Sequence, residues 1–398
     1  MENILTDFAK NYYILGLRID KHIPGYVEHY YGPSDLKKQV LLEEKRSPKK
    51  LLIDCSNLVE ILPNQGFDEK RLKFLNKNLN AIEAILHKLN GEQMAYLELV
   101  EKLFDFKPIL YEEEYFYNLT TLAESCYKGN GSLSERIYHY TQRRTIPVTN
   151  LKPLFKKALL ITQERTNKLF PNLLPSTEQV EIEEVTNKSW TMYNWYLGDY
   201  QSRIEINIDR RITWSNLLYF ASHEAYPGHH SERVIKEHLL FRIKNFFESA
   251  ILLIYSPEMV ISEGMGLIAE DILFSPIESS KILLDFINQN KANEDDEELL
   301  IKQIEVRRGF LRFESNLAYH KHVDLWSDKH LIEYAKSFEV YSDEAIKGMI
   351  RFISDEIWAP YSLAYQGERL IVEKFGKGPT PKQFKSLLTA QVLPSELV

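Results

Sequence analysis

Cysteine is scarce in this sequence, and long apolar or basic runs are missing. The 398 residues include only Cys55 and Cys126, too few for a disulfide framework, as expected for a protein of the reducing cytosol. The longest apolar run, residues 250–255, is far too short to cross a bilayer. Residues 1–10 include three charged side chains and no long apolar stretch, which argues against a signal peptide. We therefore predict a cytoplasmic protein.

An excess of positive charge is also missing. The formal net charge is −8, and no cluster of lysines and arginines of the kind that follows a phosphate backbone is present. These features argue against nucleic acid and membranes as partners. With 44% hydrophobic and 27% charged residues, the composition is that of a globular protein.

Helical periodicity dominates the chain. Apolar residues recur every three or four positions over residues 3–18, 70–89, 93–106, 151–169, 304–326 and 342–358. Alternating or aromatic-rich patterns predict three strands, at residues 180–185, 190–196 and 203–208, arranged most simply as an antiparallel meander. Thr213 should cap the helix that follows these strands. The acidic run at residues 293–298 should form a loop and a helix N-terminus.

The length of the chain exceeds what one hydrophobic core usually supports. We expect two lobes that form one integrated unit, a helical lobe over residues 1–175 and a second lobe over residues 176–398. The predicted fold class is mostly α (α+β), with a small antiparallel sheet beside the helix that ends near His223.

Residues 223–230 read His-Glu-Ala-Tyr-Pro-Gly-His-His and hold three of the eleven histidines. In zinc hydrolases with the H-E-x-x-H motif, two histidines one helical turn apart bind the metal and the glutamate is the base. Here Pro227 occupies the fourth position after His223, so that spacing fails. Either the helix is distorted and a later histidine returns to the metal, or Pro227-Gly228 ends a helix and the histidines lie in an exposed loop.

The downstream sequence favours a metal site. Glu263 lies in residues 261–271, which read as a helix start followed by an apolar stripe. A carboxylate on a second helix completes a zinc site of two histidines and one glutamate. Glu270 falls two turns after Glu263 on the same face. It is either an acceptor that orients a ligand histidine or a solvated helix carboxylate.

His223 is the first predicted ligand, and the second is His229 or His230. On a regular helix His230 returns to the face of His223, but the two Cα atoms would lie about 10 Å apart, far for a shared ion. Pro227 cannot donate to the helix ladder and Gly228 tolerates unusual dihedral angles, so the turn should bulge and bring His229 into place. We predict His229 as the ligand and His230 as a neighbour that orients the ligands or contacts substrate.

These segments resemble the bacterial family known as domain of unknown function 885, described as candidate zinc metallopeptidases. The family has a His-Glu-Ala-x-Pro-Gly-His-His segment and a Glu-Gly-Trp-Ala-Leu-Tyr-Ala-Glu-like segment. The second reads Glu263–Glu270 here, with Met265 in place of Trp and Gly266 in place of Ala. The resemblance covers nearly the whole chain, through supporting segments at residues 18–27, 30–33, 200–207 and 360–365. The last segment departs from the family, with Tyr361 at a Gly position and one or two residues missing near Gly367.

The resemblance implies a two-lobed, zincin-like peptidase in which a strand flanks the metal helix. That strand, at residues 203–208, could pair with an extended substrate. Tyr365 matches a family tyrosine and could donate to the oxyanion that develops during hydrolysis, or it could be a core aromatic. The Gly-His pair is also similar to that of other gluzincins, such as angiotensin-converting enzyme and the carboxypeptidase Taq family.

Three protein ligands leave one position open, which is typical of a catalytic zinc ion. We expect one zinc ion (Zn2+) per chain, Glu224 as the general base, and short unfolded peptides as substrates. Arg203 could bind a substrate carboxylate or face solvent on its strand. A zinc amidase or esterase acting on small molecules uses the same chemistry and stays open as an alternative. A helical binding protein with a vestigial metal site is a third reading, although such a site needs no base. The sequence does not indicate the oligomeric state.

Overall fold

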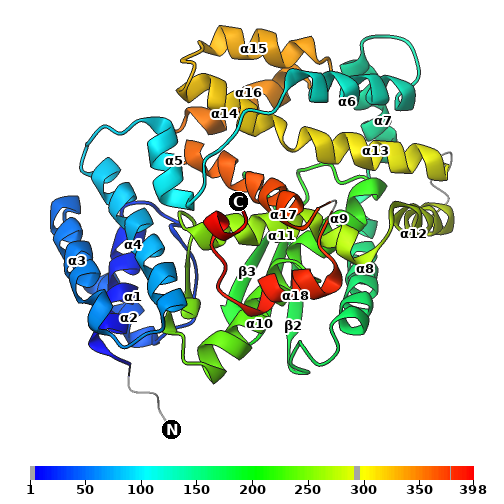
Figure 1. The fold of residues 1–398 in the computed structure, drawn as a ribbon. Helices are drawn as coiled ribbons and strands as arrows, with labels where there is room; N and C mark the ends of the chain where they lie inside the picture. The colour runs from blue at the N-terminus through cyan, green and yellow to red at the C-terminus, as the bar shows by residue number, and fades with distance from the viewer. Residues whose placement is uncertain (1–4, 291–295, 377) are drawn as a thin grey trace.

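The computed structural model describes residues 5–290, 296–376 and 378–398, and most of them lie in helices (Figure 1). The mostly α fold predicted from the sequence is confirmed. In chain order the helices are α1 (Asp7–Asp20), α2 (Ser34–Leu42), α3 (Pro48–Ile61), α4 (Glu69–Leu89), α5 (Tyr96–Phe104), α6 (Glu113–Cys126), α7 (Leu133–Arg144), α8 (Val148–Leu169), α9 (Leu217–Glu224), α10 (His229–Lys236), α11 (Pro257–Leu273), α12 (Pro276–Gln289), α13 (Glu297–Phe310), α14 (Phe313–His322), α15 (Asp328–Ser337), α16 (Asp343–Ser354), α17 (Gly367–Phe375) and α18 (Pro381–Thr389). None of the helices in these ranges is long and apolar enough to cross a membrane.

The described strands form two small sheets. They are β1 (Val27–Tyr30) paired antiparallel with β5 (Ile251–Leu253), and a sheet of β2 (Gln179–Val185), β3 (Met192–Gly198) and β4 (Gln201–Asn207) in the order β2-β4-β3. Asp199 and Tyr200 join β3 to β4 with φ angles of 51° and 63°, as a two-residue hairpin turn requires.

The predicted antiparallel meander is wrong for one of its two pairs. β3 and β4 are antiparallel, but β2 pairs with β4 in parallel. β4 carries Ile204 and Ile206, both fully buried, whereas the glutamates of β2 are exposed. The most buried strand therefore takes the central position, and the chain crosses over to place β4 between the other two.

The helix predictions hold for α1, α4, α5 and α8, with small shifts at the ends. The single helix predicted at residues 304–326 is instead split into α13 and α14, because the amides of Leu311 and Arg312 bond to carbonyls three residues back and tighten the turn. Asp296 caps α13 by accepting from the amide of Leu299 at 2.7 Å. Residues 293–295 of the acidic run lie outside the described residues.

α11 runs through the middle of the molecule and packs against α9, α17 and the short helical segment η5 (Ala359–Gln366) (Figure 1). Nearly all of its residues are buried, as expected for a helix that is apolar on every side. It begins earlier than the sequence suggested, because Ser256 Oγ accepts from the amide of Met259 at 3.3 Å and a proline fits the first helical position.

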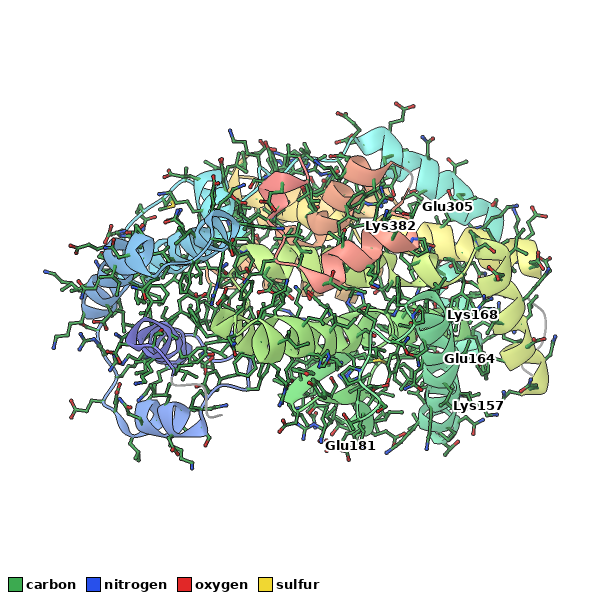
Figure 2. The ribbon with its side chains drawn as sticks, turned by 60° about the horizontal axis from the view of Figure 1, so that its bottom comes forward. Lys157, Glu164, Lys168, Glu181, Glu305 and Lys382 are labelled. Atoms are coloured by element: carbon green, nitrogen blue, oxygen red, sulfur yellow. The ribbon has the colours of Figure 1, made fainter. Side chains whose placement is uncertain are left out.

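Apolar side chains form three clusters, and the first two include residues of α11. The first joins α1, α4 and α5 with α11 and α17; the second lies among α8, α9 and α12; the third lies among α6, α13 and α16. α8 contributes one apolar face and leaves Lys157, Glu164 and Lys168 exposed along its length (Figure 2). Each cluster takes residues from both sides of position 175, and the predicted lobe boundary there stays a prediction.

Candidate metal centre

The His-Glu-Ala-Tyr-Pro-Gly-His-His segment folds as two short helices joined by a tight turn. α9 ends with Glu224 and α10 begins with His229. The amide of Gly228 donates to the carbonyl of Ser222 at 2.9 Å, and a Cβ at Gly228 would lie 2.0 Å from the carbonyl oxygen of His223. Only glycine fits this approach. The distorted turn brings the His223 and His229 rings to a centroid distance of 4.7 Å.

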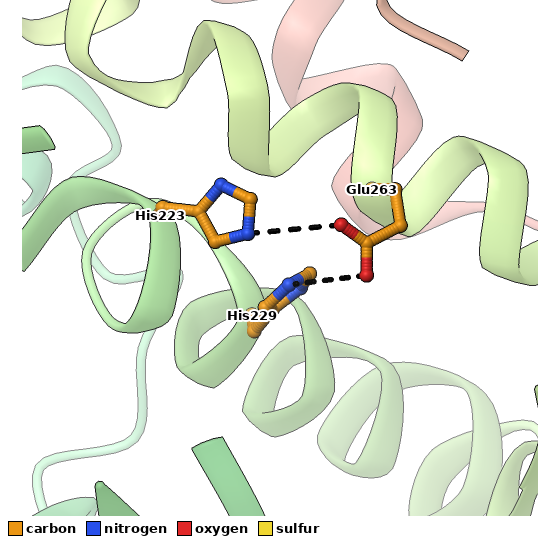
Figure 3. A group of neighbouring side chains, drawn as sticks. All are labelled: His223, His229 and Glu263. Carbon is orange, nitrogen blue, oxygen red and sulfur yellow. Dashed lines mark ion pairs between the residues drawn. The ribbon is translucent and has the colours of Figure 1, made fainter. Parts of the chain in front are cut away.

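α11 supplies a carboxylate, Glu263, to the two imidazoles (Figure 3). His223 Nε2 lies 3.7 Å from Glu263 Oε2, and His229 Nε2 lies 3.8 Å from Oε1. One possible ligand atom from each residue lies within 4.8 Å of the others. α11 can come this close because Gly266 has no side chain; a Cβ there would lie 2.8 Å from His223 Cε1. The structure thus brings together the three predicted ligands, with His229 rather than His230 in the group.

A chain of hydrogen bonds orients the ring of His229. Ser262 Oγ donates its single hydrogen to Glu232 Oε2 at 2.5 Å. The same oxygen lies 3.2 Å from His229 Nδ1, so Nδ1 carries a hydrogen and donates it. Lys236 donates to the other oxygen of Glu232, Oε1, at 2.6 Å. This tautomer directs the free lone pair of His229 Nε2 toward Glu263, as a metal-binding histidine requires.

The two oxygens of Glu263 have different surroundings. The hydroxyl of Tyr361 donates to Oε1 at 2.7 Å, whereas Oε2 is buried and makes no hydrogen bond within the described residues. A buried acceptor without a partner costs about 1–3 kcal/mol, so Oε2 favours an additional ligand. The contacts of Tyr361 and Ser262 with the group were not predicted from the sequence. Tyr361 stands where the resembling family has Gly, and no spacing pattern connects it with Glu263.

Burial sets the protonation states of the group. It lowers the pKa of His223 to about 4 and the pKa of His229 well below its ordinary value, so both rings are neutral near neutral pH. Burial raises the pKa of Glu263 to about 7, and burial together with the charge of Glu263 raises the pKa of Glu224 to about 8. A bound cation would oppose these two increases, because a nearby positive charge favours the ionised carboxylate.

The donor set fits zinc. Zinc binds imidazole nitrogen and carboxylate oxygen at about 2.0–2.2 Å, which places tetrahedral donor atoms about 3.4 Å apart. The distances of 3.7 and 3.8 Å between the carboxylate and imidazole atoms are a few tenths of an ångström wider. Small side-chain rotations close that difference. The His229 tautomer and the unpartnered Glu263 Oε2 are consistent with the same ion.

Glu224, the predicted base, is 6% exposed and is held at its main chain by β3. Asn194 Nδ2 donates to the Glu224 carbonyl at 2.6 Å. Arg233 of α10 donates to the Asn194 carbonyl at 3.0 Å and to Glu28 at 2.9 Å. β3 is therefore fastened to both helices of the motif. The prediction that residues 203–208 pair with substrate is wrong, because β4 uses both of its edges within the sheet.

Tyr365, the predicted donor to the oxyanion, lies on η5 close to the group. Its ring stands nearly perpendicular to that of Tyr361, with centroids 5.8 Å apart. Burial and the negative charge of Glu263 raise its pKa well above the ordinary value. The hydroxyl therefore keeps its proton at neutral pH and is a hydrogen-bond donor.

His230 lies in a separate polar group, beside the motif but away from the three predicted ligands. Its Nδ1 is 2.8 Å from Ser202 Oγ and its Nε2 is 2.8 Å from Glu178 Oε2. Glu178 also accepts from Tyr226 at 2.7 Å and from Gln163 at 2.6 Å. Both nitrogens of His230 are thus occupied, and the ring links α10 to β4.

Glu270 and Arg203 also have partners outside the predicted site. Glu270 lies 2.8 Å from Arg308 of α13, so it is held by an ion pair rather than by a ligand histidine. Two helical turns after Glu263, α11 has reached the interface with α13. Arg203 lies 3.3 Å from Glu183 and 3.7 Å from Glu205, so carboxylates of its own sheet occupy it.

Comparisons with known proteins support the fold only. No family model matches the sequence, so the resemblance to domain of unknown function 885 stays a prediction. No curated protein matches it either. Among solved structures, a candidate lipoprotein from Colwellia psychrerythraea has a TM-score of 0.52 at 14% identity, over 88% of this chain and 66% of that chain. The chain thus spans slightly less than two thirds of that protein and shares its fold.

Two further structures are more distant. A candidate lipoprotein of unknown function from Shewanella oneidensis has a TM-score of 0.49 at 11% identity, over 100% of this chain and 88% of that chain. An M32 carboxypeptidase from Deinococcus radiodurans R1 has a TM-score of 0.41 at 10% identity, over 93% of this chain and 84% of that chain.

Proposed function

We propose that this protein is a zinc-dependent peptidase that cleaves short, unfolded peptides. The buried group of His223, His229 and Glu263, with Glu224 beside it, carries the proposal. These three side chains would hold one zinc ion, which supplies a Lewis acid for the scissile carbonyl and makes water more acidic. The presence of Glu224 favours a catalytic site, since a purely structural site needs no base.

The side chains of this chain divide the remaining work. Glu224 accepts a proton from the attacking water and returns it to the leaving amine nitrogen. A bound cation would favour the ionised form of Glu224 that can accept the proton, and burial, which raises its pKa, makes that carboxylate a stronger base. Tyr365 keeps its hydrogen and donates to the substrate oxygen that gains negative charge. Tyr361 holds the Glu263 carboxylate in place, and Ser262 holds the His229 imidazole.

The burial of the group favours short substrates. His223, His229 and Glu263 are 7%, 5% and 6% exposed, so a rigid loop on a folded protein has little access to them. A flexible peptide can enter as an extended chain. Peptides in a mixed library should therefore be cut, and a native protein should be cut much more slowly than its denatured fragments.

The test combines metal content with turnover. The purified protein should contain about one zinc ion per chain by elemental analysis, and a chelator should abolish peptide cleavage. Glu224→Gln should keep the zinc and the fold but lose at least about 10²-fold in turnover, the usual contribution of a positioned base. Glu248→Gln is a matched control, because Glu248 is a buried glutamate paired with Arg71 on another face.

Three results would contradict the proposal. They are turnover of Glu224→Gln within a few-fold of the parent, cleavage that resists the chelator, and fast cutting of native proteins. Hydrolysis of small amides or esters without any peptide cleavage would instead indicate a zinc amidase or esterase.

A further inference from the structure

The guanidinium of Arg307 on α13 makes no hydrogen bond within the described residues. Its Nε, Nη1 and Nη2 atoms are all buried, and none has a hydrogen-bond partner within the described residues. Glu270 lies 3.7 Å away, but Arg308 holds that carboxylate at 2.8 Å. Burial is also the main reason that the pKa of Arg307 is lowered. A guanidinium offers five donors, and leaving them unused is costly, so this group favours an acceptor from outside the chain.

The position of Arg307 connects it with the candidate metal centre. Its guanidinium lies over the ring of Tyr219, 4.4 Å from the centroid. The Tyr219 ring in turn lies 5.5 Å from the ring of His223, one helical turn later on α9. These two contacts, 4.4 and 5.5 Å, place the guanidinium carbon no more than about 10 Å from the His223 imidazole.

That separation suits the end of a peptide. One extended residue spans about 3.3–3.6 Å, and a hydrogen bond between arginine and a carboxylate adds about 2.8 Å. When the scissile carbonyl of a substrate lies beside His223, the terminal carboxylate one or two residues further along that substrate reaches Arg307. The flat guanidinium binds a carboxylate through two parallel hydrogen bonds. The side chain keeps 18% of its surface exposed although its nitrogens are buried, so carboxylate binding requires the end of the side chain to rotate.

We propose that Arg307 binds the terminal carboxylate of the substrate and makes the protein a carboxyl-terminal exopeptidase that releases one or two residues. This inference rests on the proposed peptidase function. Arg307 would take the role predicted for Arg203, which lies 3.3 Å from Glu183 in its own sheet.

The test uses two peptides of identical sequence, one with a free terminal carboxylate and one with a terminal amide. The parent protein should cleave the free acid at least about 30-fold more efficiently in kcat/KM, because a buried, hydrogen-bonded charge pair is lost with the amide. Mass spectrometry should show a released amino acid or dipeptide. Arg307→Met should lose the preference, so that its kcat/KM values for the free acid and for the amide become equal.

Two further variants separate carboxylate binding from a structural role. Arg307→Lys keeps the charge but not the paired donors, so its preference for the free acid should be intermediate. Arg203→Met should keep the full preference. Calorimetry with zinc-loaded Glu224→Gln, which binds without rapid turnover, should show tighter binding of the free acid than of the amide.

The outcomes distinguish the inference from the proposed function. If the parent cleaves acid and amide equally, or cuts only internal bonds, the inference is wrong and the peptidase proposal stands. If it cleaves neither peptide, the peptidase proposal fails and the inference fails with it. The comparison of the two peptides needs only the parent protein, so a poorly folded Arg307→Met does not prevent a decision.

Discussion

His229 and His230 are neighbours at the start of α10, and both are buried, yet their surroundings are opposite. Both nitrogens of His230 are within 2.8 Å of a partner, Ser202 or Glu178. His229 uses only Nδ1, and its Nε2 faces Glu263 Oε1 at 3.8 Å, too far for a hydrogen bond. Burial therefore does not distinguish a candidate metal ligand from a structural histidine. The completeness of the hydrogen bonding does.

The largest expected effect separates the two histidines directly. His229→Ala should retain no zinc after dialysis, because it removes one of three ligands. His230→Ala should weaken zinc affinity by no more than about 10–100-fold, the usual effect of a residue behind the ligands. Elemental analysis and competitive metal titration measure both. The reverse order of affinities would show that His230 is the ligand.

A smaller change tests the tautomer of His229. Ser262→Ala removes the oxygen that accepts from Nδ1, so the ring can rotate or shift its proton. We expect about a 10–100-fold loss in zinc affinity with little change in fold. Ser280→Ala is the control, since Ser280 is a buried serine of α12 that donates to the main chain of Ile277. Equal zinc affinity in both variants would remove Ser262 from the metal centre.

A substitution in the group around His230 should lower the stability of the protein and leave its metal binding unchanged. Glu178→Gln disturbs a carboxylate that accepts from His230, Tyr226 and Gln163. We expect the free energy of unfolding to fall by about 1–3 kcal/mol while the zinc content stays unchanged. Urea denaturation and elemental analysis of one preparation measure the two quantities. Loss of zinc without loss of stability would contradict the division between the groups.

The smallest expected effect is a change in the stability of the metal-free protein with pH. The folded chain keeps protons on Glu224 and Glu263 up to pH about 8 and 7, whereas the unfolded chain releases them near 4.5. The folded state binds more protons in that window, so its stability falls as pH rises. His223 and His229 act in the opposite sense, but only below 6.5.

Thermal unfolding between pH 6.5 and 8 covers the range in which Glu224 and Glu263 titrate, together with Glu314, whose pKa burial also raises to about 7. Tm of the metal-free protein should fall across this range, and zinc should raise Tm more at the upper end than at the lower. Glu224→Gln should flatten the metal-free curve, because it removes the group with the higher pKa. A metal-free Tm that rises with pH would contradict the assigned shifts.

Local chemistry explains what the sequence by itself determined. Apolar periodicity was sufficient for α1, α4, α5 and α8, because a helix repeats its buried face every few residues. The distorted turn also followed from neighbouring residues, since Pro227 lacks an amide hydrogen and Gly228 has no side chain. That turn brings His229 close to His223.

Only the tertiary structure decided which distant segments meet. Tyr361 reaches Glu263 from η5, and Glu270 turns to Arg308 because α13 covers that end of α11. The parallel pairing of β2 with β4 follows from the central place of β4 in the sheet, not from the pattern within either strand. Arg307 lies far from the motif in sequence and beside it in space. Such contacts carry no local signal, because they arise when separate helices pack around one buried helix.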